Sequence, residues 1–283
     1  MHDVVLVTGQ EMPRPDPEAG HLLEALARIG RSATVRPWGP GTDWGAASLV
    51  VIRTTWDYSM RSAEFLDWAA AVEAKTRLVN PARVIAWNSH KRYLGELAAA
   101  GVPTIPTVLV LQGASEKERR EVLARFAGEV VVKPAISAGS RGALRASAHA
   151  PGLELHLGAL VDEGDALVQP FVPSIAEKGE SSLVFFGGDF SHAVKKHPAP
   201  HDYRVQRVYG GHVLAHEPSR AELEAAVAAL GEVEGPLAYA RVDLVETAAG
   251  PSVMELELIE PELFLPYARD AADRFVAALM ELT

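Results

Sequence analysis

Near the end of the chain, residues 253–264 (VMELELIEPELF) alternate acidic and apolar side chains. In a β-strand, Glu255 and Glu257 would point to one side and the apolar residues between them to the other, because side chains alternate with a period of two. Like charges placed side by side on a strand destabilise each other. This stretch therefore constrains the fold, since its surroundings must supply or recruit positive charge.

The segment before it, YARVDLVE, reads as a second strand and carries Asp243 between apolar neighbours. If the two strands pair through the TAAGPS turn, Asp243 joins Glu255 and Glu257 on one face. Three carboxylates without His or Cys suit Mg²⁺ or Mn²⁺, and Mg²⁺ commonly completes its coordination with water and substrate phosphates. The cluster predicts a nucleotide site. The alternative is an exposed strand face with ordinary salt bridges.

Other motifs supply what a nucleotide needs. In VVVKPAISAGSRG, Lys133 ends an apolar run, and the Ser/Gly loop that follows, with Ser140, offers backbone N–H groups to phosphate. The lysine precedes the glycines, so this is not a P-loop. The segment LVQPFVP places Gln169, Phe171 and Val172 as a wall and edge for adenine. Taken singly, each motif also fits a surface lysine, a turn or a core strand.

Two further segments carry charges that suit the same ligand. Glu180, in KGESS, is a candidate for contact with ribose, although a solvated turn carboxylate fits the same pattern. Lys195 and Lys196 end the segment FSHAVKK, where they would reach phosphates or protect an exposed edge strand.

Apolar runs at residues 3–8 and 48–52, a helical pattern at 21–30 and a strand at 33–38 predict a small N-terminal α/β domain with a parallel sheet. A short strand near residue 78 then leads through a turn into a helix that ends at Gly101. The remainder is β-rich α+β, with expected helices at 115–126, 220–231 and 266–282 and expected hairpins at 181–196 and 201–216. We expect an α/β (α+β) protein with domains at residues 1–88, 89–173 and 174–283.

The net charge of −10 and the lack of a Lys/Arg stripe argue against a general nucleic-acid partner. The chain has no cysteine, which excludes disulfides, thiolate metal sites and a cysteine nucleophile. It has no signal-peptide pattern and no apolar run of ~18 residues. We expect a cytoplasmic protein without a membrane partner that acts on a small molecule; a homodimer is left open.

In this order, the motifs resemble the ATP-grasp superfamily. They are the lysine of NSHKRYL, the strand–KP–loop, the QPFV hinge, GES, the basic strand HAVKK, R-x-D and E-x-E, and they span residues 80–265. More narrowly, NPARVIAWNSHKRYL, GESSLVFFGGDFSHAVKKHP and MELELIEPELFL are similar to the glutathione-synthetase-like branch. Within that branch the chain is similar to the D-cycloserine synthetases, which are cyclising ligases of antibiotic biosynthesis.

The resemblance implies an ATP-grasp fold in which two β-rich lobes hold ATP between them. It implies that Lys133 binds ATP and acts in catalysis, while Arg241 stabilises developing oxyanion charge. The glutamate at position 257 departs from many members, which have asparagine there. The remaining implied ligands are Lys91, Ser140, Gln169, Phe171, Val172, Glu180 and Lys196 for ATP, and Asp243, Glu255 and Glu257 for two Mg²⁺ ions, with Mn²⁺ as a substitute.

The implied activity is ATP- and Mg²⁺-dependent ligation, in which an amino-acid-like carboxylate or carbonyl becomes an acyl phosphate and a C–N bond forms. The alternatives are an intramolecular cyclo-ligase and, from another class, a non-catalytic nucleotide-binding regulatory module. In RTTWDYSM, Arg53 would hold a substrate carboxylate and Asp57 an amine, beside Trp56; Arg204 is a second candidate. The alternative for these residues is a packed or exposed loop.

Overall fold

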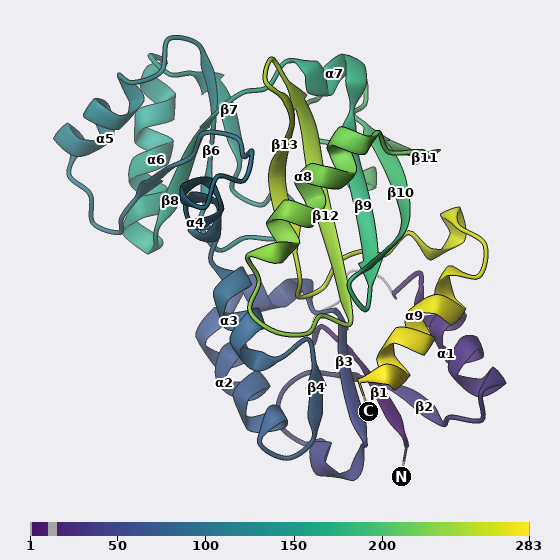
Figure 1. The fold of residues 1–283 in the computed structure, drawn as a ribbon. Coiled ribbons are helices and arrows are strands. Elements are labelled where there is room, and N and C mark those ends of the chain that lie inside the picture. Colours follow the sequence, from purple (N-terminus) through teal and green to yellow (C-terminus); the bar gives the residue numbers. More distant parts are fainter. Residues whose placement is uncertain (1, 11–15, 283) are drawn as a thin grey trace.

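The computed structural model describes residues 2–10 and 16–282. Its N-terminal sheet is entirely parallel, and its strands lie in the order β2-β1-β3-β4 (Figure 1). This confirms the parallel sheet expected from the apolar runs, which are buried on both faces. The elements of this part are β1 (Val4–Thr8), α1 (Ala19–Arg28), β2 (Ala33–Pro37), β3 (Leu49–Thr54), α2 (Ser62–Glu73) and β4 (Arg77–Val79).

A break interrupts the helix that was expected to end at Gly101. The structure has two helices, α3 (Ala82–Ser89) and α4 (Tyr93–Ala99), separated at residues 90–92. Within the break, the backbone N–H of Lys91 donates to the carbonyl of Ala135, 2.9 Å away, directly after the strand at residues 129–134. The single-helix prediction was wrong because this long-range contact replaces a helical hydrogen bond.

The middle of the chain forms a second, antiparallel sheet in the order β5-β8-β6-β7. Helix α6, which the sequence analysis did not predict, packs on this sheet together with α5, and the two helices and the sheet share one apolar core. The elements are β5 (Val108–Val110), α5 (Glu116–Leu123), β6 (Glu129–Pro134), β7 (Leu144–Ser147), α6 (Pro151–Glu163) and β8 (Ala166–Pro170).

The third sheet is antiparallel, in the order β11-β10-β9-β12-β13, and α8 lies across it (Figure 1). The expected hairpin at 181–196 is confirmed as β9 and β10. The elements are α7 (Ser174–Lys178), β9 (Glu180–Phe186), β10 (Asp189–His197), β11 (His212–His216), α8 (Arg220–Gly231), β12 (Tyr239–Thr247) and β13 (Gly250–Glu257).

The expected hairpin at 201–216 was wrong. Residues 198–211 form a loop with a short 3-10 turn, and β11 pairs instead with β10. Gly211 lies so close to the loop that an added Cβ would stand 2.1 Å from the carbonyl oxygen of Val205. The Gly-Gly pair therefore permits close backbone approach, which its composition alone does not distinguish from a hairpin turn.

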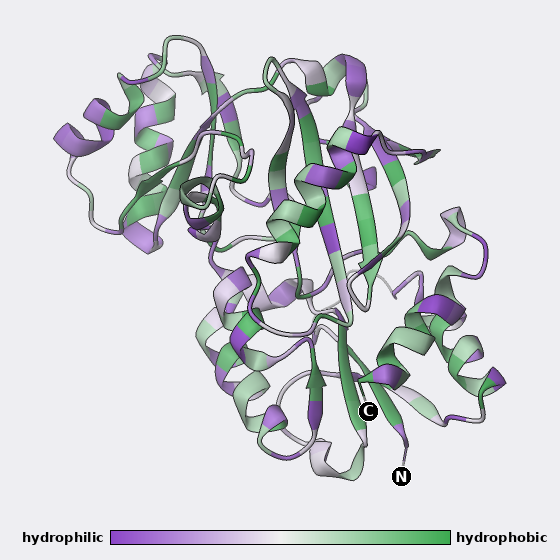
Figure 2. Cartoon of the chain, in the orientation of Figure 1, coloured by the Kyte–Doolittle hydropathy of each residue, from purple (hydrophilic) through white to green (hydrophobic). Residues whose placement is uncertain are grey.

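The C-terminal helix α9 (Ala271–Glu281) returns to pack beside α1 (Figure 1). One apolar core contains Leu22 and Leu26 of α1, Phe275 of α9 and Phe186 of β9, so it joins the first and third sheets. Figure 2 shows the same division, with hydrophobic central strands and hydrophilic residues on the outer helices. No helix in the described residues is long and apolar enough to cross a membrane.

Helix α8 begins with a capping box that also anchors the third sheet. Glu222 pairs with Ser219 at the helix start and accepts a hydrogen bond from Ser181. Lys195 forms an ion pair with it, and Nε2 of His216 lies within hydrogen-bond distance of its carboxylate. Lys195 is thus bound to Glu222 and Ser181.

This network predicts an acid-dependent loss of stability. Although burial acts to raise it, hydrogen bonds from Ser181 and Ser219 and the charge of Lys195 lower the pKa of Glu222 from 4.5 to about 2. A carboxyl whose pKa is depressed by folding stabilises the protein above its unfolded pKa, and this contribution disappears as pH falls toward the folded value. We expect the urea midpoint of the parent to fall more steeply below pH 4.5 than that of Glu222→Gln. Parallel pH profiles of the two proteins would contradict this.

Candidate active site

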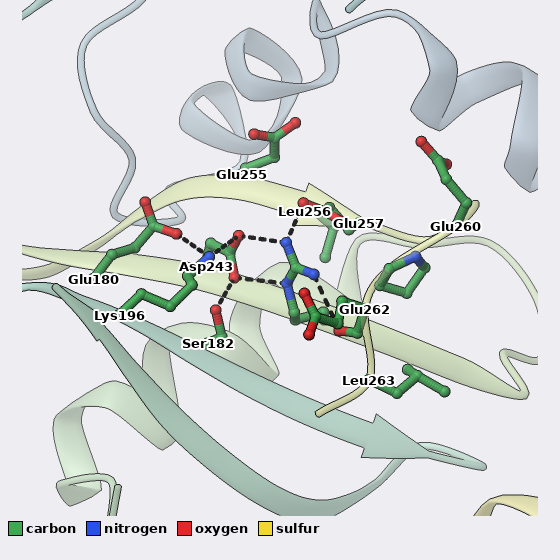
Figure 3. A network of polar contacts seen from close by, with 12 residues as sticks. Glu180, Ser182, Lys196, Asp243, Glu255, Leu256, Glu257, Glu260, Glu262 and Leu263 are labelled. Carbon is green, nitrogen blue, oxygen red and sulfur yellow. Dashed lines mark hydrogen bonds and ion pairs between the residues drawn. The ribbon is translucent and has the colours of Figure 1, made fainter. Parts of the chain in front are cut away.

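The acidic face lies where β12 pairs with β13 and β9. Asp243 stands opposite Glu255 on one side and Ser182 on the other, and Arg241 stands opposite Glu257. The pairing of these strands through the TAAGPS turn, expected from the alternating pattern, is confirmed. Figure 3 shows the side chains gathered over the strands.

Side chains from α3 and α4 hold the outer edge of β13. Asn88 donates to the carbonyl of Leu256 and accepts from the N–H of Leu258, at 2.8 and 2.9 Å. The hydroxyl of Tyr93 lies 3.1 Å from both the N–H and the carbonyl oxygen of Leu256. These contacts satisfy an edge strand and fix the orientation of Glu255 and Glu257. The sequence analysis missed both residues, although they flank Lys91 in NSHKRY.

Asp243 is buried and fully bound. One carboxylate oxygen accepts from Ser182 at 2.5 Å and from Nε of Arg241 at 2.9 Å, and the other accepts from Nη2 of Arg241 at 2.9 Å and from Lys196 at 3.0 Å. Despite burial, these cations lower the pKa of Asp243 far below its usual range. Asp243 is therefore a carboxylate held by two protein cations.

The same cations bind neighbouring carboxylates. Arg241 also donates to Glu257, and Lys196 also pairs with Glu180. Burial nevertheless raises the pKa of Glu180 and of Glu257 to about 7 each, so negative charge in this region is not fully compensated.

Glu255 is held by Lys91, whose Nζ lies 3.1 Å from the carboxylate and 2.7 Å from the carbonyl oxygen of Ser137 in the Ser/Gly loop. Lys133 lies nearby on β6, and burial lowers the pKa of its amine while Glu255 raises it. The positive charge that the acidic stretch requires is supplied in large part by the protein itself, through Lys91, Lys196 and Arg241. The lysines and carboxylates that the sequence pattern singled out do lie together.

The metal ligands expected at Asp243, Glu255 and Glu257 fit a cation unequally. No three His, Asp or Glu side chains of the described residues converge closely enough to hold a metal by themselves. Glu255 and Glu257 have side chains 29% and 27% exposed and keep free oxygen lone pairs, so they suit Mg²⁺. Asp243 accepts two hydrogen bonds on each oxygen and would have to release Arg241 or Lys196 to bind a metal.

A cavity of about 490 Å³ lies against the expected adenine hinge. Phe171 and Val172 line it, but no charged residue of the acidic cluster does. The guanidinium of Arg145 lies 3.5 Å from the ring centroid of Phe171, and the amide of Gln169 donates to Thr107 at 2.8 Å. The hinge thus has an apolar surface, and contacts with Arg145 and Thr107 hold its side chains in place.

The loop at residues 198–211 approaches the Ser/Gly loop. The hydroxyl of Tyr209 lies 3.4 Å from the carbonyl oxygen of Gly139, next to Ser140, which has a positive φ of 61°. Arg204, the second substrate candidate, pairs with Asp202 at 2.8 Å and stacks on Tyr209. In this arrangement Arg204 stabilises the loop.

Two expected substrate residues have structural roles instead. Arg53 is 1% exposed and binds Glu18 at 2.9 Å and the carbonyl of Pro261 at 3.2 Å. Asp57 is buried and accepts from Trp38 Nε1 at 3.0 Å and from the N–H of Gln10 at 2.8 Å. Neither side chain is available to hold a substrate carboxylate or amine, so these two assignments were wrong.

Trp56 remains beside the site, because its Nε1 donates to the backbone carbonyl of Glu260 at 3.3 Å. Two residues that the sequence analysis left without a role lie in the same region. They are Glu260 itself and Tyr58, whose pKa is raised by burial and then by Glu260 and Glu255. The EPEL segment after β13 was visible in the sequence, but its approach to residues 56–58 was not.

Comparison with known proteins finds relatives that match most of the chain. Residues 4–80 match the family "D-cycloserine synthetase DcsG, N-terminal domain", and residues 99–248 match "Prokaryotic glutathione synthetase, ATP-grasp domain". The chain is 39% identical over 281 residues to the cycloserine biosynthesis protein DcsG of Streptomyces lavendulae, covering 92% of each chain. It is 30% identical over 197 residues to a glutathione synthetase of Parasynechococcus marenigrum (strain WH8102), covering 68% of this chain and 59% of that protein.

Solved structures agree. The crystal structure of D-cycloserine synthetase DcsG superposes with a TM-score of 0.90 at 35% identity, covering 99% of both chains. A D-alanine–D-alanine ligase from Bacillus anthracis complexed with ATP shares the fold, with a TM-score of 0.74 at 13% identity over 99% of this chain and 97% of that one. The chain therefore belongs to the ATP-grasp family, in its D-cycloserine synthetase group, and is an ATP-dependent ligase that forms carbon–nitrogen bonds.

Proposed function

We propose that this ligase closes a ring within one small, serine-derived amino acid, as a cytoplasmic enzyme of the cycloserine type. The observation that carries the proposal is the match of the N-terminal domain, residues 4–80, to the D-cycloserine synthetase family. The ATP-grasp lobes alone do not distinguish ring closure from intermolecular ligation, since they match glutathione synthetases as well. Intermolecular ligation is the second candidate, and neither reaction involves a nucleic acid or a membrane. A homodimer is compatible with either.

In this proposal Lys133, Lys91 and the Ser/Gly loop with Ser140 hold the ATP phosphates, because they bring cations and backbone N–H groups to one place. Phe171 and Val172 form the apolar wall for adenine, with Gln169 behind them, Glu180 at the ribose and Lys196 at the phosphates. Two Mg²⁺ ions, replaceable by Mn²⁺, neutralise phosphate charge when bound. Glu255 and Glu257 would hold them, joined by Asp243 if it released Arg241 or Lys196.

The reaction needs no protein nucleophile. A carboxylate oxygen of the substrate attacks the γ-phosphorus of ATP, which gives an acyl phosphate and ADP. A nitrogen of the same molecule then attacks the acyl carbon, phosphate leaves, and the nitrogen loses a proton. Arg241 is fixed by Asp243 and Glu257, so its guanidinium is positioned to stabilise developing oxyanion charge without reorganising.

The test is phosphate release with ATP, Mg²⁺ and a panel of D- and L-serine derivatives that carry a second nitrogen, followed by mass spectrometry. A product lighter than the amino acid supplied, formed with one phosphate, supports ring closure. A heavier condensed product indicates intermolecular ligation. If ATP binds but no member of the panel stimulates hydrolysis, the regulatory-module alternative replaces both.

A further inference from the structure

The acidic cluster contains a carboxylate that its own cations leave uncompensated. Asp243, Glu180, Glu255 and Glu257 each have a lysine or arginine partner. Glu260 has no hydrogen-bond or ion-pair partner for its side chain among the described residues. Figure 3 shows it beyond Glu257, apart from Asp243 and Lys196 and joined to none of the residues drawn by a dashed line.

Carrying this charge is unfavourable in the absence of a partner. Burial, followed by the like charges of Glu257 and Glu255, raises the pKa of Glu260 to about 8, and the lysine at position 91 offsets this only in part. A cation from outside the protein would remove that cost. Two side chains hold the main chain here, since Trp56 donates to the carbonyl of Glu260 at 3.3 Å and Arg53 to that of Pro261 at 3.2 Å.

Tyr58 presents a second unpartnered polar group at the same place. The residue is 4% exposed, and its hydroxyl makes no hydrogen bond to any described residue. Phe65 packs against the ring in a tilted arrangement with centroids 5.0 Å apart, which restricts the direction of the ring. The pKa of Tyr58 is raised well above its usual value by burial and then by Glu260, so the phenol stays a neutral donor near that carboxylate.

The substrate of the proposed reaction has two charged groups, a carboxylate and an ammonium. The carboxylate must approach the γ-phosphate, which the lysines and Arg241 surround. The ammonium cannot be accepted by those cations and requires a carboxylate that is not already paired. Glu260 meets this requirement, and its backbone carbonyl accepts a hydrogen bond from Trp56 of the N-terminal domain.

We propose that Glu260 binds the ammonium group of the substrate, while the hydroxyl of Tyr58 donates a hydrogen bond to another polar atom of the same molecule. This inference rests on the proposed function for the class of substrate. In this proposal, the segment after β13 and residues 56–58 together select substrates that carry an amino group. Arg53 and Asp57 support these two elements from behind.

The test measures binding rather than turnover, so that it does not depend on the reaction. The probes are D-cycloserine and isoxazolidin-3-one, which is the same ring without its amine, titrated calorimetrically into the full chain with Mg·ADP. For Glu260→Gln we expect D-cycloserine to bind ~10- to 100-fold more weakly, as for loss of one charge-assisted hydrogen bond. Isoxazolidin-3-one should bind parent and Glu260→Gln equally. Tyr58→Phe should weaken both probes by ~2- to 10-fold.

Two controls separate this role from general effects. Glu262→Gln removes a charge two residues along the same segment and should change D-cycloserine affinity by less than ~3-fold. Mg·ADP affinity and thermal melting should be unchanged in Glu260→Gln, which shows that the fold is intact. Equal weakening of both probes by Glu260→Gln, an equal effect of Glu262→Gln, or no binding of D-cycloserine to the parent would each overturn the subsite. Failure of the proposed function looks different, because the parent would then bind the probe without releasing phosphate for any serine derivative.

Discussion

Replacing Glu255 by Gln is expected to lower kcat by ~10³-fold while leaving the fold intact, which is the size of effect seen when a preorganised charge is lost from a transition state. Glu255 is the carboxylate of the cluster that joins both lysines of the predicted phosphate site, through its ion pair with Lys91 and its proximity to Lys133. It also keeps lone pairs for Mg²⁺. The neutral amide retains the shape of the side chain but loses the charge.

Stability should not follow activity in this variant. Burial acts to raise the pKa of Glu255, but attraction to Lys91 and Lys133 outweighs burial and the repulsion from Asp243 and lowers it, so its carboxylate contributes to stability. Lys91 keeps its hydrogen bond to Ser137 in the variant, and we expect the melting temperature without ligand to fall by only ~2–4 °C. The rise produced by Mg·ATP should shrink, because a ligand raises the melting point only in proportion to its binding to the native state.

The matched control is Glu217→Gln, the same chemical change at an exposed residue that is not part of the acidic cluster. Its steady-state kinetics should match the parent within ~2-fold. If Glu255→Gln retains parental kcat and an equal Mg·ATP-dependent shift in melting temperature, its assignment as a metal ligand is wrong.

Much of this site could be predicted from the sequence, for a physical reason. The alternation of acidic and apolar residues in β12 and β13 fixes both the face and the pairing of the strands, since a slip of one residue would bury the glutamates in an apolar core. Asp243 and Glu255 therefore lie opposite each other as expected. The order of the lysine, loop and hinge motifs similarly identified the fold.

The predictions that failed depended on distant partners that no local pattern reveals. The sequence around Arg53 gives no sign that Glu18 and the carbonyl of Pro261 close over its guanidinium. Likewise, the helix break at Lys91 depends on the hydrogen bond from its N–H to the carbonyl of Ala135. Position 211 requires glycine because the carbonyl of Val205 leaves no room for a Cβ. Local patterns report periodicity and turn chemistry, whereas these contacts depend on how the sheets are placed against each other.

The Arg53–Glu18 pair is the basis of the largest stability effect that we expect. Both side chains are nearly inaccessible, at 1% and 3% exposed, and their closest atoms are 2.9 Å apart. Glu18 also accepts hydrogen bonds from the N–H groups of Leu263 and Leu265, each at 2.8 Å. The pair thus ties the N-terminal domain to the segment that carries Glu260.

Arg53→Ala should lower the free energy of unfolding by ~3–5 kcal/mol, because it leaves the Glu18 carboxylate buried without a cation. Burial already raises the pKa of Glu18, with Arg53 opposing that rise. A carboxyl with a raised folded pKa is best tolerated below its unfolded value and becomes unfavourable as pH rises through the folded value. The deficit of Arg53→Ala, measured by urea unfolding, should therefore shrink as the pH is lowered toward the model carboxyl value of 4.5.

The double variant Arg53→Met/Glu18→Gln distinguishes loss of an ion pair from loss of packing. It removes both charges while keeping two side chains of similar length, and Gln can still accept from one backbone N–H. Its stability should exceed that of Arg53→Ala by ~1–3 kcal/mol, since an apolar or neutral replacement of a buried pair costs less than a broken one. If the double variant is less stable than Arg53→Ala and the deficit is independent of pH, the guanidinium contributes through packing alone.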